Sequence, residues 1–363
     1  MTRGVFVFIS VVVLGCIGVF VYNTVLGLGV TKELAYHAPD QCYRVTGKDM
    51  AGPEDIQIAG PYAVISADDR RATSAAVAAG DAVSTKFGGV YVMDMRLPRP
   101  DALRMSHDGP EDFHPHGLSI WKLDDRKYRL FLINHPVAGG HTVELFDWDM
   151  DQGLVLTHVE TITDPHMLSP NDLVATGPRS FYFTNDRGSE TDLGRTLESV
   201  MRLSRSQVGY YDGTNGRFVI TDLKMANGIT TSHDGTELYV AELMRGTVNF
   251  YDIDQATMDV TLTDQVALNT GLDNLDVDED GNIWSGAHVK LLDFVTYAGD
   301  ETKLAPSHIV KLTLNKDGPG GKVDEVLLSD GADISASTVA AKFGNRIAIG
   351  SVMDSHALIC ELD

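Results

Sequence analysis

One pattern of short apolar runs recurs six times along this chain of 363 residues, and it limits the possible folds more than any other feature. In each unit a short polar residue opens an apolar run, and a turn and a second apolar run follow. The opening runs are DIQIAG from Asp55, HGLSIW from His116, NDLVAT from Asn171, NGITTS from Asn227, NLDVDE from Asn274 and STVAAK from Ser337. A repeat of about 45–65 residues indicates an array of similar structural units.

The runs within each unit have the length and composition of β-strands. The second runs are YAVISAD, RLFLINH, SFYFTND, ELYVAEL, NIWSGAH and RIAIGSV, and most units add a third run such as TVNFYDID or HALICELD. The pairs Asp234-Gly235 and Asp280-Gly281 separate runs where a hairpin turn needs positive φ. Six such units predict an all-β fold, a six-bladed β-propeller. A large β-sandwich is the alternative, but it does not explain the six-fold recurrence. Helical signal is sparse, and we expect one helix within residues 191–209.

The N-terminus is apolar and predicts a membrane anchor. No charged residue lies between Arg3 and Lys32, and the apolar run is longer than the roughly 20 residues that a helix needs to cross a bilayer. No convincing signal-peptide cleavage site follows, so an uncleaved anchor is favoured. We therefore divide the chain into an anchor segment at residues 1–31 and a propeller domain at residues 32–363. Arg3 weakly places that domain outside the cytoplasm, in the periplasm or the extracellular space.

The charge balance limits the partners. The formal net charge is −22, with 51 acidic against 29 basic residues, and such a surface repels a phosphate backbone. Nucleic acid is therefore excluded as an expected partner. An acidic excess fits cation binding, although most of the carboxylates are expected to be solvated surface.

Two of the three cysteines stand at opposite ends of the propeller domain. Cys42 opens this domain, Cys360 lies near its end, and Cys16 lies in the apolar run. A bridge between Cys42 and Cys360 would join the two ends, and an exported location favours it. Two unpaired thiols are the alternative.

The polar residues that open the six units are candidate metal ligands. The innermost strand of each propeller blade lines the central tunnel, so these residues should gather at one mouth of it. They are Glu54, Asp55, His116, Asn171, Asp172, Asn227, Asp273, Asn274 and Ser337. Carboxylate and amide oxygens are the ligands that Ca²⁺ prefers. Asn and Asp before a strand are also ordinary turn residues, but turn geometry alone does not explain a polar pair with at least one carboxylate in three of the six units.

Other metal and catalytic motifs fit the sequence less well. The HPH stretch at residues 114–116 lacks the spacing of a zinc site. The stretch DVDEDGN from Asp276 is similar to the start of an EF-hand loop, but the twelfth position is Ala287 instead of Glu. His114 is expected to face solvent, and His288 and His356 remain open candidates for the mouth.

Taken together in order, nine stretches resemble the paraoxonase family of calcium-dependent lactonases and arylesterases. They are PEDIQI, FHPHGLSIW, LINHP, SPNDLVATGP, FYFTND, MANGITTSHDG, YVAEL, LDNLDVD and HALICEL. They span essentially the whole propeller domain, and the order of all nine is more specific than any single motif.

The resemblance implies two calcium ions in the tunnel and a specific set of site residues. The catalytic ion would be held by Glu54, Asn171, Asn227, Asp273 and Asn274. The structural ion would be held by Asp55, Asp172 and the backbone carbonyl of Leu118. His116 and His135 would form the family's histidine dyad, and Cys42 and Cys360 would form its disulfide.

The implied chemistry is ester hydrolysis. Ca²⁺ would act as a Lewis acid on a lactone or ester carbonyl, and His116 would take a proton from the attacking water with help from His135. Asp273 is an alternative base or nucleophile, and Glu54 would help to position water. The family has a mobile lid in the first blade, but the corresponding residues 68–87 are small and polar here, so substrate preference does not carry over.

Three functions follow as hypotheses. The first is a calcium-dependent hydrolase of lipophilic lactones, acyl homoserine lactones among them, with arylesterase activity and weak phosphotriesterase activity, that meets its substrates at the membrane. The second is a gluconolactonase-like enzyme acting on hydrophilic sugar lactones. The third is a non-catalytic propeller that is stabilised by calcium and binds a partner.

Overall fold

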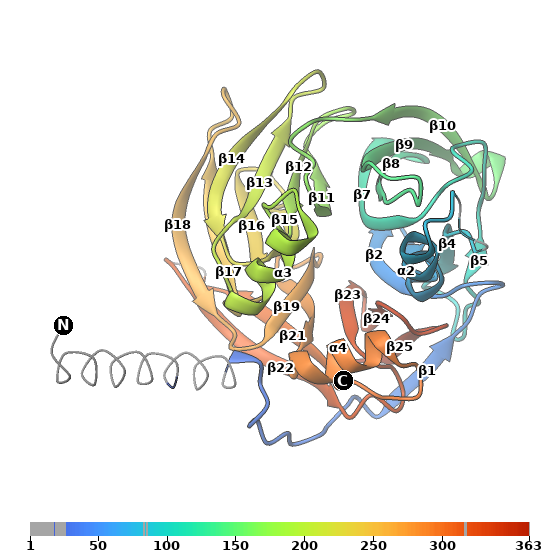
Figure 1. Ribbon diagram of the computed structural model, residues 1–363. Helices are drawn as coiled ribbons and strands as arrows, with labels where there is room; N and C mark the ends of the chain where they lie inside the picture. The colour runs from blue at the N-terminus through green and yellow to red at the C-terminus, as the bar shows by residue number, and fades with distance from the viewer. Residues whose placement is uncertain (1–17, 19–26, 83, 85, 316–317, 363) are drawn as a thin grey trace, which may run out of the picture.

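The computed structural model describes residue 18 and residues 27–82, 84, 86–315 and 318–362, and its strands form six sheets around a common axis (Figure 1). The predicted six-bladed β-propeller is therefore confirmed. The first blade consists of β2 (Pro53–Ala59), β3 (Tyr62–Ala67), β4 (Gly89–Asp94) and β5 (Leu103–Arg104). The second consists of β7 (Pro115–Asp124), β8 (Lys127–Asn134), β9 (Thr142–Asp149) and β10 (Val155–Ile162), with β6 (Ser106–His107) at its edge.

The next three blades each contain four consecutive antiparallel strands. The third is β11 (Pro170–Ala175), β12 (Phe181–Asn185), β13 (Ser206–Tyr211) and β14 (Gly216–Leu223). The fourth is β15 (Ala226–Thr231), β16 (Glu237–Glu242), β17 (Thr247–Ile253) and β18 (Val260–Ala267). The fifth is β19 (Gly271–Val277), β20 (Ile283–His288), β21 (Ser307–Leu314) and β22 (Gly321–Ser329).

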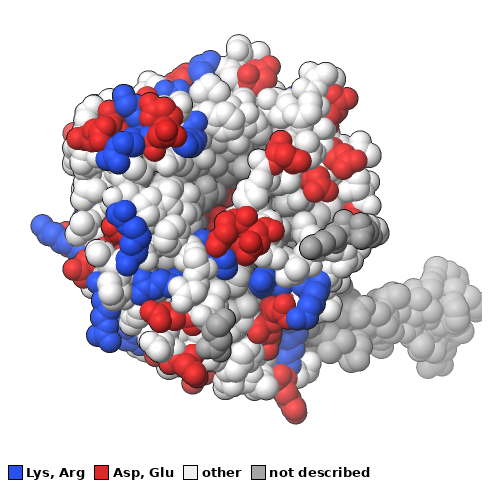
Figure 2. Space-filling model, turned by 180° about the vertical axis from the view of Figure 1, so that it is seen from behind, with Lys and Arg blue, Asp and Glu red and all other residues white. Residues whose placement is uncertain are grey.

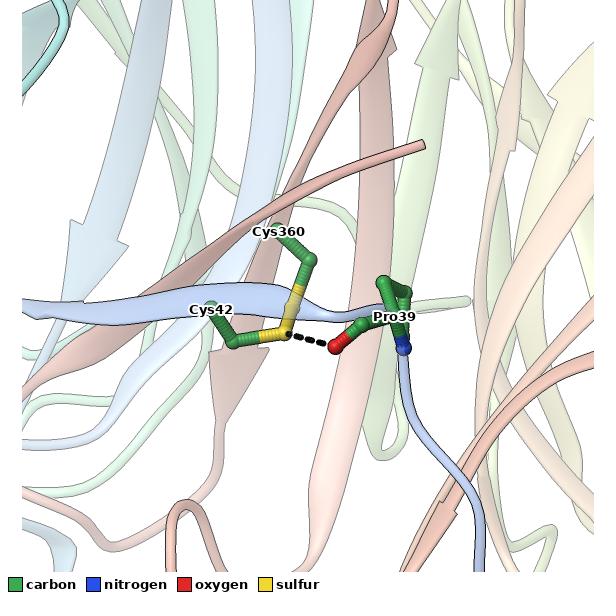
Figure 3. Close-up of a disulfide and its surroundings, with 3 residues drawn as sticks. All are labelled: Pro39, Cys42 and Cys360. Atoms are coloured by element: carbon green, nitrogen blue, oxygen red, sulfur yellow. Dashed lines mark hydrogen bonds between the residues drawn. A yellow bond between two sulfur atoms is a disulfide. The ribbon is translucent and has the colours of Figure 1, made fainter. Parts of the chain in front are cut away.

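The sixth blade is built from both ends of the domain. It contains β23 (Ser337–Phe343), β24 (Arg346–Ser351), β25 (Ala357–Glu361) and, at the outer edge, β1 (Gln41–Val45). β1 pairs antiparallel with β25, and Cys42 stands opposite Cys360 in this register. The two cysteines form a disulfide beside Pro39, as Figure 3 shows, so the predicted bridge is confirmed.

The first strand of each blade lies at the axis. Each of these first strands contacts the first strand of both neighbouring blades, which closes a ring of six inner strands. The inner strands are β2, β7, β11, β15, β19 and β23. Apolar clusters fill the interfaces between adjacent sheets, for example where the rings of Phe131 and Phe181 lie 5.8 Å apart between the second and third blades. The turn glycines Gly235 and Gly281 adopt positive φ, as the hairpin pattern predicts.

In the part of the chain that the structure describes, the α-helices α2, α3 and α4 lie on one face of the ring (Figure 1). The predicted helix is α3 (Asp192–Met201), whereas α2 (Arg70–Ala79) and α4 (Leu291–Gly299) were not predicted. α2 replaces the expected loop: the Asp69 side chain accepts a hydrogen bond from the amide of Ala72 at its N-terminus, and Gly80 ends it with a left-handed conformation. A 3₁₀ turn spans Met150–Gln152. Figure 2 shows the opposite face, where the surface is hollowed near the centre and charged side chains of both signs surround the hollow.

The predicted anchor segment lies almost wholly outside the described residues, since only residues 18 and 27–31 of it are described. Within the described part of the chain, no helix has both the length and the apolar character needed to span a membrane.

Candidate functional site

Every inner strand carries a β-bulge at the position of its predicted site residues. The register of pairing shifts between Pro53 and Asp55 in β2, between Pro115 and Leu118 in β7, and at the equivalent places in β11, β15, β19 and β23. A regular strand sends consecutive side chains to opposite faces. A bulge breaks this alternation and re-aims side chains next to active sites. The bulges therefore let neighbours such as Glu54 and Asp55 both contribute to the tunnel.

The bulged residues meet at one mouth of the tunnel. The Nδ2 atom of Asn274 donates to Glu54 Oε1 at 2.9 Å, which joins the fifth blade to the first. His116 Nε2 lies 3.5 Å from Glu54 Oε1 and 3.5 Å from Asn171 Nδ2. The structure thus brings residues of four blades into one cluster, although they are far apart in the sequence.

Four acceptor oxygens in this cluster are buried without a hydrogen-bond partner. They are Glu54 Oε2, Asn171 Oδ1, Asn227 Oδ1 and Asn274 Oδ1. A buried polar atom left unpaired costs roughly 1–3 kcal/mol. All four belong to the five side chains predicted to hold the catalytic ion, and a cation that takes oxygen ligands would satisfy them together. The donor set therefore fits Ca²⁺.

The nearest cation on the protein itself does not replace such an ion. Arg70, the first residue of α2, places its guanidinium 3.7 Å from Glu54 Oε2 but donates instead to the carbonyls of Gly52 and Pro115, at 2.9 and 3.3 Å. Burial raises the pKa of Glu54, and the charge of Arg70 opposes that rise. In the described part of the chain, no group of three or more His, Cys, Asp or Glu side chains is arranged to hold a metal.

Asp55 and Asp172 lie deeper and connect neighbouring blades. Asp55 accepts from the amides of Ile56 at 2.8 Å and of Leu118 at 2.7 Å, and the second bond reaches the next blade. Asp172 accepts from the amides of Leu173 and Ile229 in the same way, at 2.7 and 2.8 Å. Burial, and then repulsion from neighbouring carboxylates, raises the pKa of both side chains well above the ordinary value. Asp55 and Asp172 are the two side chains that the resemblance assigns to the structural ion.

Asp273 has a histidine partner that the sequence did not assign. Its Oδ2 atom lies 2.8 Å from Nε2 of His288, and the His288 ring stacks on Phe294 of α4 with centroids 4.1 Å apart. Burial raises the pKa of Asp273, and the hydrogen bond from His288 opposes this. His288 was an open candidate for the mouth and lies there. His356 instead bonds the backbone carbonyl of Asp333 at 2.7 Å.

The predicted histidine dyad is in contact. The rings of His116 and His135 meet edge to face with centroids 5.1 Å apart. Burial lowers the pKa of both rings well below the ordinary value, and nearby positive charge, such as that of Arg70, adds to the shift. His135 also lies against His141, with 2.8 Å between the two Nδ1 atoms. No sequence motif had singled out His141.

The expectation that His114 faces solvent is wrong. Its side chain is 1% exposed, and Nδ1 lies 2.7 Å from Asp68 Oδ1 and 3.0 Å from the hydroxyl of Thr73 on α2. Nε2 lies 3.1 Å from Asp112 Oδ1, so the ring stands between two carboxylates. No local pattern indicates this contact, since Asp68 is 46 residues away in the chain.

An apolar groove of about 350 Å³ opens between α3 and α4. Its apolar lining includes Leu28, Val200, Met225, Leu243, Leu291 and Phe294. Because Phe294 also stacks on His288, the groove and the tunnel mouth share a wall. Arg187 stands at the polar side of this groove, where Nε donates to the Ser199 hydroxyl at 3.4 Å.

Comparison with known proteins points to one family. A family model described as Arylesterase matches residues 38–362. Human serum paraoxonase/arylesterase 1 is 31% identical over 280 residues, which cover 76% of this chain and 77% of the relative. Chicken serum paraoxonase/arylesterase 2 is 31% identical over 339 residues and 92% of each chain.

Solved structures with much lower identity share the fold. A luciferin-regenerating enzyme superposes with a TM-score of 0.54 at 12% identity, over 89% of this chain and 95% of that one. Regucalcin from Agrobacterium tumefaciens, described as a calcium-binding protein, gives 0.52 at 14% identity, over 91% and 96%. A structure described as a putative gluconolactonase gives 0.50 at 16% identity, over 90% and 96%.

Proposed function

This chain belongs to the arylesterase family and is an ester-hydrolysing enzyme, and from this premise we propose that it is a calcium-dependent hydrolase that opens lactones at the tunnel mouth. The observation that carries the proposal is the set of four buried, unpaired oxygens on Glu54, Asn171, Asn227 and Asn274. A site built for ester hydrolysis by side chains alone would have no need to leave these acceptors unsatisfied.

Two ions fit the two layers of the tunnel. The catalytic ion would be held by Glu54, Asn171, Asn227, Asp273 and Asn274. The structural ion would be held by Asp55, Asp172 and the carbonyl of Leu118. When bound, Ca²⁺ supplies a Lewis acid that polarises an ester or lactone carbonyl and stabilises negative charge on its oxygen. The calcium-binding description of regucalcin, which shares the fold, supports this choice of metal.

The protein's own groups move the proton. His116 lies within 3.5 Å of both Glu54 and Asn171 and is therefore placed to accept a proton from a water held at the mouth. His135, in contact with His116, receives or orients that proton. Glu54 helps to hold the water, and Asp273, held by His288, is the alternative base.

We propose lipophilic lactones, including acyl homoserine lactones, as the preferred substrates. The apolar groove beside Phe294 is adjacent to the mouth and suits an acyl chain. Aryl esters would be accepted by the same chemistry, and phosphotriesters only weakly. The fold-level likeness to a putative gluconolactonase supports sugar lactones as the second candidate, but the groove would offer them no polar partners except at its edge.

We also propose that residues 1–31 anchor the propeller on the outer side of a membrane, where lipophilic lactones accumulate. The Cys42–Cys360 disulfide supports an oxidising compartment, in the periplasm or outside the cell. No nucleic acid partner is proposed.

Turnover by the full-length chain, with and without a calcium chelator, tests the function. Turnover is measured for the wild type, His116→Gln and His158→Gln. The substrates are acyl homoserine lactones, aliphatic δ-lactones, gluconolactone and phenyl acetate. His158 is the matched control, because it lies on β10 in the same blade and bonds Glu144 at 2.9 Å, away from the tunnel.

The proposal expects calcium-dependent opening of the lipophilic lactones. His116→Gln should lower kcat by about 10²–10⁴-fold, the usual contribution of a general base, and His158→Gln should leave it unchanged. Turnover of gluconolactone alone would support the second candidate function, hydrolysis of sugar lactones, in place of the first. Turnover that persists in the chelator would contradict the calcium requirement.

A further inference from the structure

We propose that His141 is the third member of a proton relay, which leads from His116 through His135 to solvent. This inference rests on the proposed function, because it concerns the proton that ester hydrolysis releases. It assigns a positioning role to a residue that no family motif in this sequence includes.

The loop between β8 and β9 places His141 on His135. The loop begins at His135 and ends at His141, and Gly139 and Gly140 both adopt positive φ within it. Successive left-handed residues are accessible to glycine without strain, and they turn the chain back on itself. As a result, the two rings lie 4.8 Å apart at 87°, with a distance of 2.8 Å between their Nδ1 atoms.

This contact requires that the two histidines share one proton. A neutral imidazole carries a single N–H, so at a 2.8 Å contact one Nδ1 must donate and the other must accept. When His135 donates, its Nε2 is free to accept a proton from the direction of His116. Arrival of a proton at Nε2 then lets the Nδ1 proton pass to His141, which keeps the charge moving in one direction.

The three rings form a continuous path from the tunnel to an exposed loop. His116 and His135 meet edge to face with centroids 5.1 Å apart, and the proposed relay requires a bridging water or a rotation of one ring to connect them. His141 is half-buried and follows the exposed residues 138–140 directly. It is therefore the member of the path from which a proton reaches bulk water.

The reaction needs such an exit. Water adds its oxygen to the carbonyl carbon, the ring C–O bond breaks, and the alkoxide takes one proton. The carboxylic acid that forms is ionised at neutral pH, since carboxyl groups titrate near 4. One proton per turnover therefore leaves the site, and without an exit the histidines would hold it and block the next cycle.

The charges around His141 favour release. Burial, and then the charge of Arg195 on α3, lower the pKa of His141, while Asp186 acts in the opposite direction. Arg70, His114 and His116 are the charged or titratable groups that face His135 besides His141. Because most of the groups that act on His135 and His141 are basic, neither ring retains an extra proton.

Nuclear magnetic resonance of the full-length chain, labelled with ¹⁵N in its histidines, tests the shared proton without any turnover. We expect a coupling across the hydrogen bond between the two Nδ1 atoms, and we expect His141→Gln to change the tautomer signals of His135. His158→Gln should leave them in place. Absence of the coupling, together with unchanged His135 signals in His141→Gln, would overturn the relay.

Steady-state kinetics test the role of His141 in the relay. His141→Ala should lower kcat for a lactone about tenfold or more with little change in KM, and added imidazole should restore the rate, since proton transfer by a positioned group contributes 10²–10⁴-fold at most. A loss that imidazole does not restore, or no loss at all, would contradict the relay. If the wild type opens no ester or lactone with calcium, the proposed function fails, and the resonance experiment still decides whether His135 and His141 share a proton.

Discussion

Glu54 and Asp55 are neighbours in the chain, yet both residues are buried in the tunnel, where they are 1% and 3% exposed. The polar residues that open each repeat unit predicted which positions gather there, because the repeat places them at equivalent points of six blades. The sequence did not predict the bulge that turns both neighbours inward, since a bulge is defined by pairing with a distant strand.

Single residues were hardest to predict where their partners are distant. His116, His135 and Asp273 were identified through motifs; the structure places His116 against His135 and Asp273 against His288, and their roles stay predictions. His114 was misjudged because its carboxylate partner Asp68 follows another strand, and His141 was missed because only the loop conformation brings it to His135.

His114 predicts a pH dependence of stability. Burial lowers the pKa of His114, but the hydrogen bond and charge of Asp68, with Asp112, outweigh this and raise it above the ordinary value of 6.5. A raised pKa in the folded state stabilises the protein fully below pH 6.5, and that stabilisation is lost as the pH rises through the folded-state value. We expect the free energy of unfolding to decrease over that range by up to about 1.4 kcal/mol per pH unit from this residue.

Denaturant unfolding at a series of pH values checks this, with His114→Gln compared with the wild type. The difference between the two proteins isolates His114 from the histidines whose pKa values are lowered. It should shrink as the pH rises above 6.5. A difference that stays constant from pH 6 to pH 9 would show that His114 is neutral throughout.

At the scale of elements, strands were predictable and two helices were not. Every inner strand has an opening polar residue and an apolar run, so periodicity and turn residues were sufficient. α2 has only ten residues, and its small polar side chains favour a loop. Its Asp69 cap, alanine-rich interior and Gly80 end are nevertheless helix signals. α4 has no side-chain cap and includes Phe, Val, Thr and Tyr, so local propensity is weak and packing decides its conformation.

Close contact between inner strands predicts that Gly228→Ala disturbs the proposed calcium site. A Cβ atom at Gly228 of β15 would lie 2.4 Å from the carbonyl oxygen of Asp273 and 2.5 Å from the amide nitrogen of Leu275. These are backbone atoms of β19, so this strand must move, and overpacking of this kind costs typically 1–3 kcal/mol. Since Asp273 and Asn274 are proposed ligands, we expect both the unfolding temperature and the calcium affinity to fall.

Gly299→Ala is the matched control for that variant. Gly299 ends α4, and a Cβ atom there would have no heavy atom within 4 Å. Alanine is the better helix former by up to about 1 kcal/mol, so stability should hold or rise slightly. Calorimetric titration with calcium and thermal unfolding of both variants give the comparison. Equal calcium affinity in Gly228→Ala and Gly299→Ala would show that the inner strands tolerate the added methyl group.

At the scale of the whole molecule, the disulfide holds the ring closed. It joins residues 318 positions apart, and it fixes β1 to β25 in a blade that would otherwise lose its outer strand. Removing a native disulfide typically costs 2–5 kcal/mol, and long loops lie at the upper end in the chain-entropy model. The double variant Cys42→Ser, Cys360→Ser should therefore unfold at a clearly lower denaturant concentration, and reduced wild type should match it. Identical unfolding of oxidised and reduced wild type would contradict this role.

Calcium should stabilise the whole ring, because the proposed ligands come from all the blades except the sixth. Glu54, Asp55, Asp172 and Asp273 are each at most 5% exposed. In the described structure, the basic side chains within ion-pair distance of the first three are Arg70 and His116, and both lie beside Glu54. Bringing their inner strands together therefore costs free energy that a bound cation offsets.

A ligand present at 100 times its dissociation constant adds about 2.7 kcal/mol to the free energy of unfolding. We expect a chelator to lower the unfolding temperature by several degrees. Asp172→Asn should reduce that calcium-dependent increment, because it removes the negative charge of a side chain proposed to hold the structural ion, whereas His158→Gln should retain it in full. Magnesium should restore less, since it demands a smaller octahedral site. Unfolding temperatures that coincide in calcium and in chelator, for protein shown by elemental analysis to be metal-free at the start, would contradict a calcium role in the fold.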